Sequence, residues 1–310
     1  MPPKIVVVGS LNMDLIFRAP HLPRPGETVA GLSFATAAGG KGGNQAVAAA
    51  RLGASVAMIG CVGDDSHGMQ LRDGLMAEGI DCSGVELAAG MSTGVAMVLV
   101  AENGQNEIVI VGGANDAVTP DMVARHAASI DSAGFVLCQM EIPAETVAWT
   151  IARARKAGAK VILNPAPISR LLPTSWLKSV DYLVPNEIEA ASITGISVKT
   201  IDEARTAARA LRAAGAANVI VTLGAQGVLA SHHNVLRHHP VRAAQAVDTT
   251  AAGDTFVGGF AAALADGRSV PDAIVYGQLA ASISVTRHGA QPSIPYAREI
   301  APVSAAGSGG

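Results

Sequence analysis

The segment Asp248-Thr249-Thr250-Ala251-Ala252-Gly253-Asp254-Thr255-Phe256 leads into an apolar stretch that ends at Leu264. Small residues let the backbone approach a ligand closely, and the free N–H groups at the start of a helix attract anions. An acid beside such an anion hole can deprotonate a hydroxyl while a phosphoryl group arrives. Asp and Thr also favour the first turn of any helix, so the segment alone is equally compatible with an ordinary helix start.

The composition of the 310-residue chain excludes several classes of protein. The formal net charge of -3 leaves no basic footprint for a nucleic acid or an anionic membrane surface. The residues are 49% hydrophobic, but no apolar run approaches the ~18–20 residues of a membrane span. The first residues lack the order of a secretory signal. Cys61, Cys82 and Cys138 are odd in number and widely spaced, so we expect reduced thiols in a cytoplasmic protein.

Short apolar runs rich in β-branched residues alternate with longer, Ala-rich amphipathic stretches. The predicted strands are Ile5–Val8, Val56–Ile59, Phe135–Leu137, Val161–Leu163, Tyr182–Val184 and Val219–Leu223. The predicted helices are Asn44–Leu52, Met69–Glu78, Ala144–Ala157, Ile188–Thr194, Ile201–Ala214, Asp254–Leu264 and Pro271–Ser284. Strands that are apolar on both faces, with helices between them, indicate an α/β fold with a mostly parallel central sheet and helices on both faces.

Two segments do not fit this alternation. The segment Asp14–Phe34 is rich in proline, and Val95–Val111 reads as a hairpin with Asn103-Gly104 at its turn. We expect these segments to form a small β-sheet lid, built from about 12–38 and 92–112. The first hairpin strand is apolar on both faces, so one face could cover a substrate and the other could form a homodimer. The lid and the α/β sheet would make one domain, 1–302, followed by a flexible tail, 303–310.

Polar residues follow several of the predicted strands. Glu141, Asn164, Asn186 and Thr222 each lie at or just past the end of a different strand. In an open α/β sheet, ligands bind outside the carboxyl ends of the strands. Each residue taken singly could be an ordinary turn residue. Their convergence on one edge of the sheet favours a binding site there.

A second glycine-rich segment, Gly39–Ala46, opens the first predicted helix. It differs from a nucleotide-binding P-loop because no Ser or Thr follows Lys41 to hold magnesium. Its backbone N–H groups, Lys41 and Asn44 could instead bind a polyhydroxylated ligand, or the segment could be only a flexible turn. Asn12 and Asp14 lie on one face of an extended segment. No GxGxxG motif precedes them, which disfavours a dinucleotide-dependent dehydrogenase.

On these motifs the chain resembles the PfkB carbohydrate kinase family over nearly its whole length, from Lys4 to Pro295. The segments Gly39–Ala46 and Asp248–Phe256 correspond to the two family signatures. Further similar segments are Gly9–Asp14, Asn164–Pro167, Asn186–Glu189, Thr222–Gly227 and Thr286–Ser293. Within the family, the ribose-phosphorylating members are the most similar. The resemblance implies ATP-dependent phosphorylation of the primary hydroxyl of a sugar, foremost D-ribose to D-ribose 5-phosphate.

The resemblance also implies roles for individual residues. Asp254 would be the catalytic base, and the N–H groups of Ala251, Ala252, Gly253 and Asp254 would form the anion hole. The sugar would be held by Asn12, Asp14, Gly40, Lys41, Asn44, Glu141 and Asp254. ATP would contact Asn186, Thr222, Leu223, Gly224, Ala225, Gln226, Gly227, Gly253 and Gln278, while Glu189 would help to organise Mg²⁺ and phosphate. A K⁺ ion would lie against Asp248, Thr250, Ser284, Arg287, Gly289 and Ser293.

Other functions stay open at this stage. Related kinases act on nucleosides, deoxyribose, fructose or ketodeoxygluconate, and a sugar-binding regulator without catalysis is a further alternative. The acidic residues Asp14 and Glu141 favour a neutral polyol over a sugar acid. Only Phe17 and Phe34 are available in the lid to stack on a nucleobase. A regulator should have a damaged base or anion hole, and Asp254 and its neighbours are intact.

Overall fold

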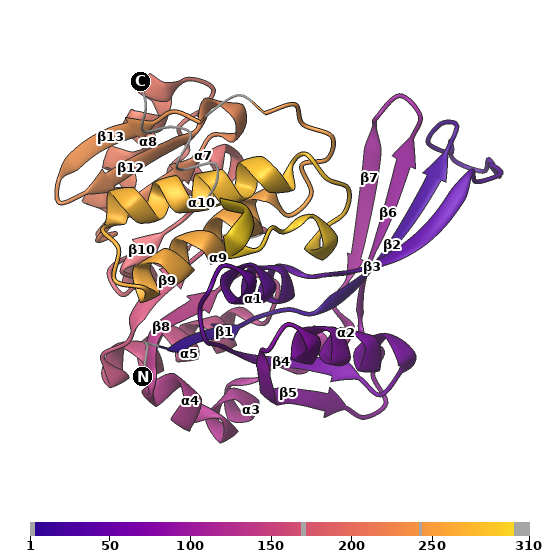
Figure 1. The fold of residues 1–310 in the computed structure, drawn as a ribbon, viewed down its shortest axis with the longest axis horizontal. Coiled ribbons are helices and arrows are strands. Elements are labelled where there is room, and N and C mark those ends of the chain that lie inside the picture. The colour runs from indigo at the N-terminus through magenta and orange to yellow at the C-terminus, as the bar shows by residue number, and fades with distance from the viewer. Residues whose placement is uncertain (1–3, 169–171, 242–243, 301–310) are drawn as a thin grey trace.

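The computed structural model of the chain describes residues 4–168, 172–241 and 244–300, and the structural statements below concern these residues. An α/β body carries a small second sheet that projects from it (Figure 1). The strands are β1 Lys4–Val8, β2 Asn12–Ala19, β3 Ser33–Gly39, β4 Val56–Gly63, β5 Asp81–Ala88, β6 Gly94–Ala101, β7 Asn106–Val111, β8 Ala133–Cys138, β9 Lys160–Leu163, β10 Tyr182–Leu183, β11 Val219–Thr222, β12 Val228–His232 and β13 Val235–His239. The helices are α1 Lys41–Arg51, α2 Ser66–Ala77, α3 Pro120–Arg125, α4 Ala127–Asp131, α5 Ala144–Ala157, α6 Thr174–Leu177, α7 Glu187–Thr194, α8 Ile201–Ala213, α9 Ala252–Ala265 and α10 Val270–Ser284.

The order of the strands in the large sheet determines where a ligand can bind. The nine strands run β13-β12-β11-β10-β9-β8-β1-β4-β5, and only the pairings of β12 with its neighbours β11 and β13 are antiparallel. The chain extends the sheet from β1 to one side through β4 and β5, and later to the other side from β8 onward. The connections after β1 and β8 therefore leave in opposite directions. Such a switch point opens a crevice at the carboxyl ends of the strands.

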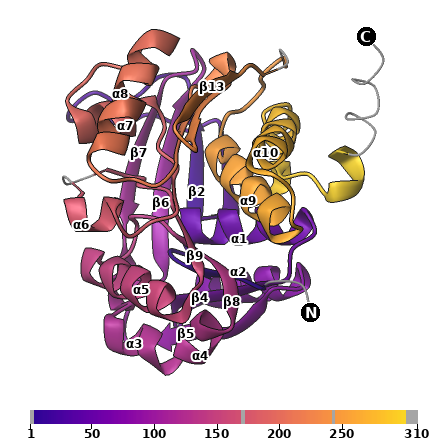
Figure 2. The same ribbon diagram turned by 90° about the vertical axis from the view of Figure 1, so that its left-hand side faces the viewer.

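Helices cover both faces of the large sheet, as the apolar strands predict. Successive side chains of β1 point to opposite faces, so Ile5 and Val7 lie in one core and Val6 and Val8 in the other. The first core also holds α1, α2, α9 and α10, and the second holds α3 to α8 (Figure 2). The predicted α/β fold with a mostly parallel central sheet is confirmed.

Helix α9 packs unusually close to its two neighbours. A Cβ atom on Gly258 would lie 2.4 Å from Cβ of Ala48 and 2.8 Å from the carbonyl oxygen of Gln45, both in α1. A Cβ atom on Gly277 of α10 would lie 2.7 Å from the carbonyl oxygen of Phe256. Glycine at these positions therefore permits backbone contact that any larger residue would prevent. As a result, the first turn of α9 lies directly beside the first turn of α1.

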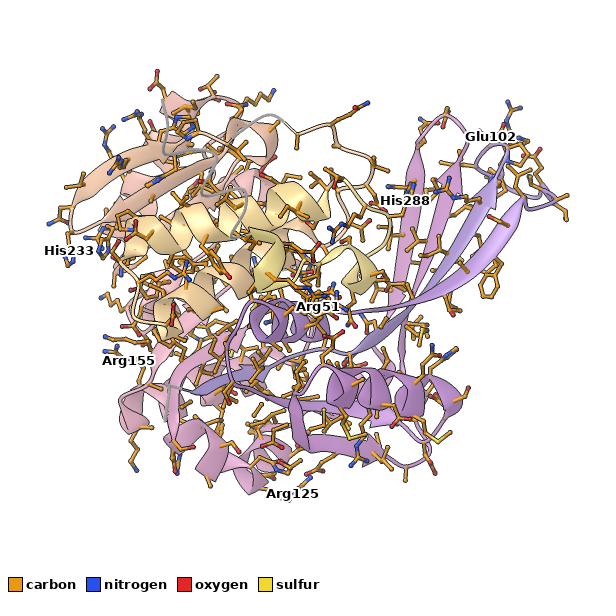
Figure 3. The ribbon with its side chains drawn as sticks, in the orientation of Figure 1. Arg51, Glu102, Arg125, Arg155, His233 and His288 are labelled. Atoms are coloured by element: carbon orange, nitrogen blue, oxygen red, sulfur yellow. The ribbon has the colours of Figure 1, made fainter. Side chains whose placement is uncertain are left out.

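The small sheet has the strand order β3-β2-β6-β7, with β2 and β6 parallel and the outer pairs antiparallel. The predicted hairpin is confirmed: β6 and β7 pair through a turn in which Gly104 has a positive φ of 83°. Figure 3 shows Glu102, at the start of this turn, at the far tip of the sheet. The apolar segment Ile108–Val111 is at least half exposed, so this edge presents hydrophobic side chains to solvent.

The predicted strands leave out three strands of the large sheet, β5, β12 and β13, and the predicted helices leave out the three short helices α3, α4 and α6. The segment of β5 reads as a turn because it contains Ser83 and Gly84. Gly84 is needed because a Cβ atom there would lie 2.8 Å from the carbonyl oxygen of Met58 on the neighbouring strand. The three cysteines are free and buried, as expected. Among the described residues, no helix combines the length and the apolar character needed to cross a membrane.

Candidate active site

A cavity of about 220 Å³ lies at the carboxyl ends of the central strands, where the switch point predicts a ligand. The first turns of α1, α7 and α9 and the ends of β9, β10 and β11 contribute its walls. The lining residues are Lys41, Asn164, Ala166, Val184, Asn186, Glu189, Thr222, Thr249, Ala251, Ala252, Gly253, Asp254 and Val257. Three of the four polar residues predicted at strand ends are among them, so the structure brings these distant segments together.

The start of α1 is fastened to the ends of β1 and β8. The Lys41 N–H donates to Glu141 Oε2 (2.9 Å), the Gly42 N–H to Ser10 Oγ (3.2 Å) and the Gly43 N–H to the Ser10 carbonyl (2.9 Å). Ser10 Oγ in turn donates to Glu141 Oε2 (2.6 Å). The sequence suggests that backbone N–H groups of Gly39–Ala46 could bind a ligand, but these three donate within the protein instead. The glycines serve close packing: a Cβ atom on Gly42 would lie 2.5 Å from the Ser10 nitrogen.

The ammonium group of Lys41 lies among four carboxylates. Burial alone would lower the pKa of Lys41, but the charges of Asp254, Glu141, Glu189 and Asp14 outweigh it, so the pKa is raised. For Asp14, burial and the like charges of Glu141 and Asp254 raise the pKa from 3.8 to about 7, although Lys41 opposes this. The lysine therefore stays charged, and the pKa of Asp14 lies near neutrality.

Asp254 is 7% exposed and is held by two consecutive residues of α1. Asn44 Nδ2 donates to Asp254 Oδ2 (3.0 Å), and Gln45 Nε2 donates to Asp254 Oδ1 (2.9 Å). Asn44 Oδ1 is buried and has no hydrogen-bond partner in the described part of the chain. Asn44 thus orients the carboxylate with its nitrogen and leaves an oxygen that can accept a hydrogen bond from a bound hydroxyl group.

The first turn of α9 has N–H groups that are free to meet an anion. Ala251 adopts a left-handed conformation with φ 56° and, among the described residues, no side chain caps the helix. The Ala252 N–H donates to the Thr249 carbonyl, and the Thr255 N–H donates to the Ala251 carbonyl. The intervening N–H groups, which belong to cavity-lining residues, are the free donors that a helix start offers to an anion. A Cβ atom on Gly253 would have no heavy atom within 4 Å, so space lies in front of this turn.

The opposite wall of the cavity comes from α7. Asn186 and Glu189 form a capping box, in which Asn186 Oδ1 accepts from the Glu189 N–H and the Glu189 carboxylate accepts from the Asn186 N–H and side-chain amide. Burial raises the pKa of Glu189. Asn186 also forms a parallel bridge to Thr222, after which the chain makes a 3₁₀ turn, Gly224–Gln226. Gln278 lies elsewhere: its Nε2 donates to the His239 carbonyl, and it does not line this cavity.

The residues predicted to hold a cation come from two segments that touch. The Gly289 N–H donates to Asp248 Oδ2 (2.9 Å), and Thr250 donates to Oδ1 through its N–H and its hydroxyl. These hydrogen bonds outweigh burial and lower the pKa of Asp248, which stays ionised. Ser284 and Ser293 are buried, and each donates to a carbonyl three residues earlier. The guanidinium of Arg287 forms an ion pair with Glu299. The next residue, His288, is labelled in Figure 3 and lies on the side of the α/β body that faces the small sheet.

The structure adds polar residues that the sequence reasoning did not assign to the site. Asn115 Nδ2 donates to Asn12 Oδ1 (2.7 Å), and the Leu11 N–H donates to Asn115 Oδ1 (2.8 Å), which fixes the start of β2. Ser10, Gln45 and Gln139 are the others. Ser10 and Gln45 lie within segments that match the family motifs, so proximity in sequence could have found them. Gln139 lies closer to the end of the predicted strand Phe135–Leu137 than Glu141 does, so the strand-end pattern could have found it, whereas Asn115 carries no such signal.

Comparison with known proteins agrees with this geometry. A family model described as pfkB family carbohydrate kinase matches residues 2–297. A ribokinase from Haemophilus influenzae is 43% identical over 295 residues, which cover 95% of this chain and 96% of the relative. A deoxyribokinase from Salmonella typhi is 40% identical over 291 residues, covering 94% and 95%. The structure of Arabidopsis thaliana ribokinase in complex with ribose and ATP superposes with a TM-score of 0.92 at 35% identity, covering 98% of this chain and 99% of that chain.

The raised pKa of Asp14 predicts that the stability of the folded protein depends on pH. Because the folded-state pKa of about 7 exceeds the ordinary 3.8, the folded protein keeps this proton where the unfolded chain has lost it. Stability therefore falls as the pH rises between those values, and the loss is complete above pH ~7. We expect Asp14→Asn to raise the melting temperature at pH 8 by at least ~2–4 °C, the scale of about 1 kcal/mol in a chain of this size. The gain should shrink toward pH 4.

Thermal unfolding of the ligand-free protein, followed by circular dichroism between pH 4 and pH 8, measures this effect. Asp73→Asn on the exposed face of α2 is the matched control and should show no such pH-dependent gain. An Asp14→Asn protein whose melting temperature is unchanged or lower at pH 8 would contradict the prediction.

Proposed function

The chain belongs to the pfkB family of carbohydrate kinases, and we propose that it transfers the γ-phosphoryl group of ATP to the primary hydroxyl of D-ribose, giving D-ribose 5-phosphate. One observation carries the proposal: a carboxylate, Asp254, lies in the first turn of a helix whose free N–H groups face the same cavity. A base and an anion site are thereby adjacent. Because a deoxyribokinase is almost as similar as the ribokinase, deoxyribose is the second candidate.

In this proposal the sugar lies between β2 and the start of α1. The hydroxyl groups would be bound by Asn12, Asp14, Gly40, Lys41, Asn44 and Glu141. The unpartnered Asn44 Oδ1 and the charged Lys41 support this, since one accepts and the other donates hydrogen bonds. Asp14 has room because position 39 is glycine: a Cβ atom on Gly39 would lie 2.4 Å from the Asp14 carboxylate. A carboxyl group with a pKa of about 7 can donate or accept near neutral pH, which suits a neutral hydroxyl group.

The reaction would be an in-line phosphoryl transfer. The sugar oxygen forms a bond to the γ-phosphorus, the bond from phosphorus to the bridging oxygen of ADP breaks, and the hydroxyl proton passes to Asp254. Phosphoryl transfer depends on positioning and charge stabilisation more than on covalent chemistry. The N–H groups of Ala251, Ala252, Gly253 and Asp254 would stabilise the negative charge on the transferring group. Ala252 is the weakest of these donors, because its N–H already donates to the Thr249 carbonyl (3.2 Å). Burial of Asp254 favours proton transfer without competition from water.

ATP would extend from this anion site along the ends of β10 and β11. The residues proposed to contact it are Asn186, Thr222, Leu223, Gly224, Ala225, Gln226, Gly227, Gly253 and Gln278. Gln278 is the weakest member, because its amide already bonds to the backbone of β13. Mg²⁺ bound to the nucleotide would neutralise phosphate charge, and the buried carboxylate of Glu189 in the cavity wall fits a supporting role for it.

A monovalent cation such as K⁺ would be held beside the anion site by Asp248, Thr250, Ser284, Arg287, Gly289 and Ser293. The ionised Asp248 and the adjoining hydroxyl and carbonyl oxygens are ligands suited to such a cation. Arg287 would contribute through its backbone, since its side chain pairs with Glu299. The cation would add positive charge and order the turn that leads into α9, whose N–H groups form the anion hole.

The small sheet would be a lid, formed by about 12–38 and 92–112, that covers the sugar. Its strand β2 follows β1 through only three residues and carries Asn12 and Asp14, so movement of the sheet would move sugar ligands. The half-exposed apolar segment Ile108–Val111 supports association of two copies through this sheet, as a homodimer.

The first prediction of this function concerns the base. We expect the wild-type protein to release ADP when supplied with D-ribose and Mg-ATP. Asp254→Asn should lower kcat by at least ~100-fold, the usual scale for loss of a general base, with little change in KM. The amide keeps the size of the carboxylate but cannot take the proton. A coupled assay of ADP release measures both parameters.

Asp266→Asn, in the exposed turn after the same helix, is the control and should retain wild-type kcat. Deoxyribose, fructose, ketodeoxygluconate and nucleosides are assayed in parallel, and the highest kcat/KM identifies the substrate. Near-normal turnover by Asp254→Asn would refute the role of the base. Absence of ADP release with every compound would favour a sugar-binding regulator.

The second prediction concerns the cation. Turnover should rise several-fold when KCl replaces the chloride of a large organic cation at constant ionic strength, because the small cation alone fits beside Asp248. Asp248→Asn should reduce the ratio of the rate in KCl to the rate in the organic salt. KM for the sugar should change less than this ratio does. Equal rates in both salts would remove the cation from the proposal.

The third prediction concerns the lid. Sedimentation velocity at micromolar concentration should show a dimer, and Ile108→Glu should shift it to a monomer, because a buried charge in an apolar interface is unfavourable. Ile108 is 55% exposed in the single chain. Val235→Glu is the control, since Val235 is 63% exposed on β13 at the far edge of the large sheet. A wild-type monomer would contradict the proposed dimer.

A further inference from the structure

A chain of buried side-chain amides runs beneath Asp254. Gln139 Nε2 donates to Gln45 Oε1 (2.7 Å). Gln45 Nε2 uses its two hydrogens on Asp254 Oδ1 (2.9 Å) and on Asn164 Oδ1 (3.1 Å). Gln45 and Gln139 are completely buried. Four groups from α1, α9 and the ends of β8 and β9 are thus joined in one hydrogen-bonded network.

The direction of every amide in this network is determined by its surroundings. Asn164 Nδ2 donates to the carbonyl of Val184 (2.9 Å), and a carbonyl can only accept. Asn164 must therefore present its oxygen to Gln45. Gln45 must then present its nitrogen to Asn164 and Asp254, and its oxygen to Gln139. Reversal of either amide would place two acceptors against each other in a buried site, which is strongly unfavourable.

We propose that Gln139 is a positioning residue that acts through Gln45 to orient the carboxylate of Asp254 for proton transfer. This inference rests on the proposed role of Asp254 as the base. Gln139 does not line the cavity, so it would not touch the sugar or the nucleotide. Its effect passes through one hydrogen bond: when Gln139 occupies Gln45 Oε1, the nitrogen of Gln45 is directed at Asp254.

Two glycines give the network its space, and Gln139 Oε1 is buried without a hydrogen-bond partner in the described part of the chain. A Cβ atom on Gly9 would lie 2.1 Å from Gln139 Oε1, so glycine at the end of β1 creates the space for this amide. On the other side, Gly258 lets α9 approach the backbone of Gln45. Such packing restricts rotamers, and a reacting group misplaced by about 1 Å can slow a reaction ~100-fold.

Asn44 and Gln45 then have different tasks, although both donate to Asp254. Asn44 lies in the segment proposed to bind the sugar, and its free oxygen is available to a ligand. Gln45 has no free donor, since both hydrogens of its amide are used within the protein. Gln45 therefore provides the constant contact to the carboxylate, whether or not a sugar is bound.

The test is steady-state kinetics of Gln139→Met, which keeps the length of the side chain and removes its donor. We expect kcat for D-ribose to fall ~10-fold or more, while KM for D-ribose and for ATP changes less than ~2-fold. Gln45→Met should lower kcat at least as much. If Gln139 acts through Gln45, adding Gln139→Met to Gln45→Met should change kcat less than ~2-fold further.

Thr150→Val is the matched control, because Thr150 is equally buried, has an unpartnered hydroxyl in the described part of the chain and lies on α5, outside the network. Its kcat should equal that of the wild type. Melting temperatures of all variants are recorded, and if Gln139→Met does not fold, Gln139→Leu replaces it in the same cycle.

The outcomes separate this inference from the proposed function. If Asp254→Asn is inactive but Gln139→Met keeps wild-type kcat, or if the two glutamine substitutions act independently, the positioning role is wrong and the function stands. If Asp254→Asn turns over normally, the proposed base is wrong and the network has no carboxylate to orient. A loss confined to KM would also overturn the inference, because it would place Gln139 in substrate binding.

Discussion

The site depends on the hydrogen bonds that join the first turn of α1 to the ends of β1 and β8. Ser10 and Glu141 accept three successive backbone N–H groups of that turn, which a helix start would otherwise leave unpaired. Two strands whose connections diverge are thereby linked by a third element. Because Lys41 and the two donors to Asp254, Asn44 and Gln45, lie in or next to this turn, a shift of α1 would move all three together.

The sequence predicts the architecture better than the site. Alternating apolar and amphipathic stretches and the Asn103-Gly104 turn are local signals, and the predicted sheet, covering helices and hairpin are all present. The role of the glycines in Gly39–Ala46 is not local. The sequence shows glycines in this segment but not what lies against them. In the structure the backbone of Ser10, just after β1, occupies the space in front of Gly42, and no local pattern predicts this contact. For the same reason the sequence does not reveal the hydrogen bond between Gln139 and Gln45, which are 94 positions apart.

Electrostatics supports the proposal that this site takes both a neutral sugar and a highly charged nucleotide. Lys41 is the cation at the centre of four carboxylates, and its raised pKa keeps it charged. Three of these acids come from different elements. Asp14 belongs to β2 of the small sheet, Glu141 follows β8 and accepts from the start of α1, and Glu189 belongs to the wall formed by α7. With a pKa of about 7, Asp14 can lose its charge at little cost when a hydroxyl group needs an acceptor or a donor. In the proposed function the phosphates would instead meet the N–H groups at the start of α9, on the side of the cavity to which Glu189 also belongs.

The geometry of α1 and α9 explains how two neighbouring residues can hold one carboxylate. Asn44 and Gln45 are successive residues and point about 100° apart around the helix. Both reach Asp254 because α9 begins directly beside this turn, and this closeness requires glycine at position 258. Each carboxylate oxygen then has a donor that arrives from a different direction, which fixes both the position and the plane of the group. A side chain held in this way needs no rearrangement when the substrate hydroxyl approaches, and this is the condition under which a buried carboxylate is an effective base.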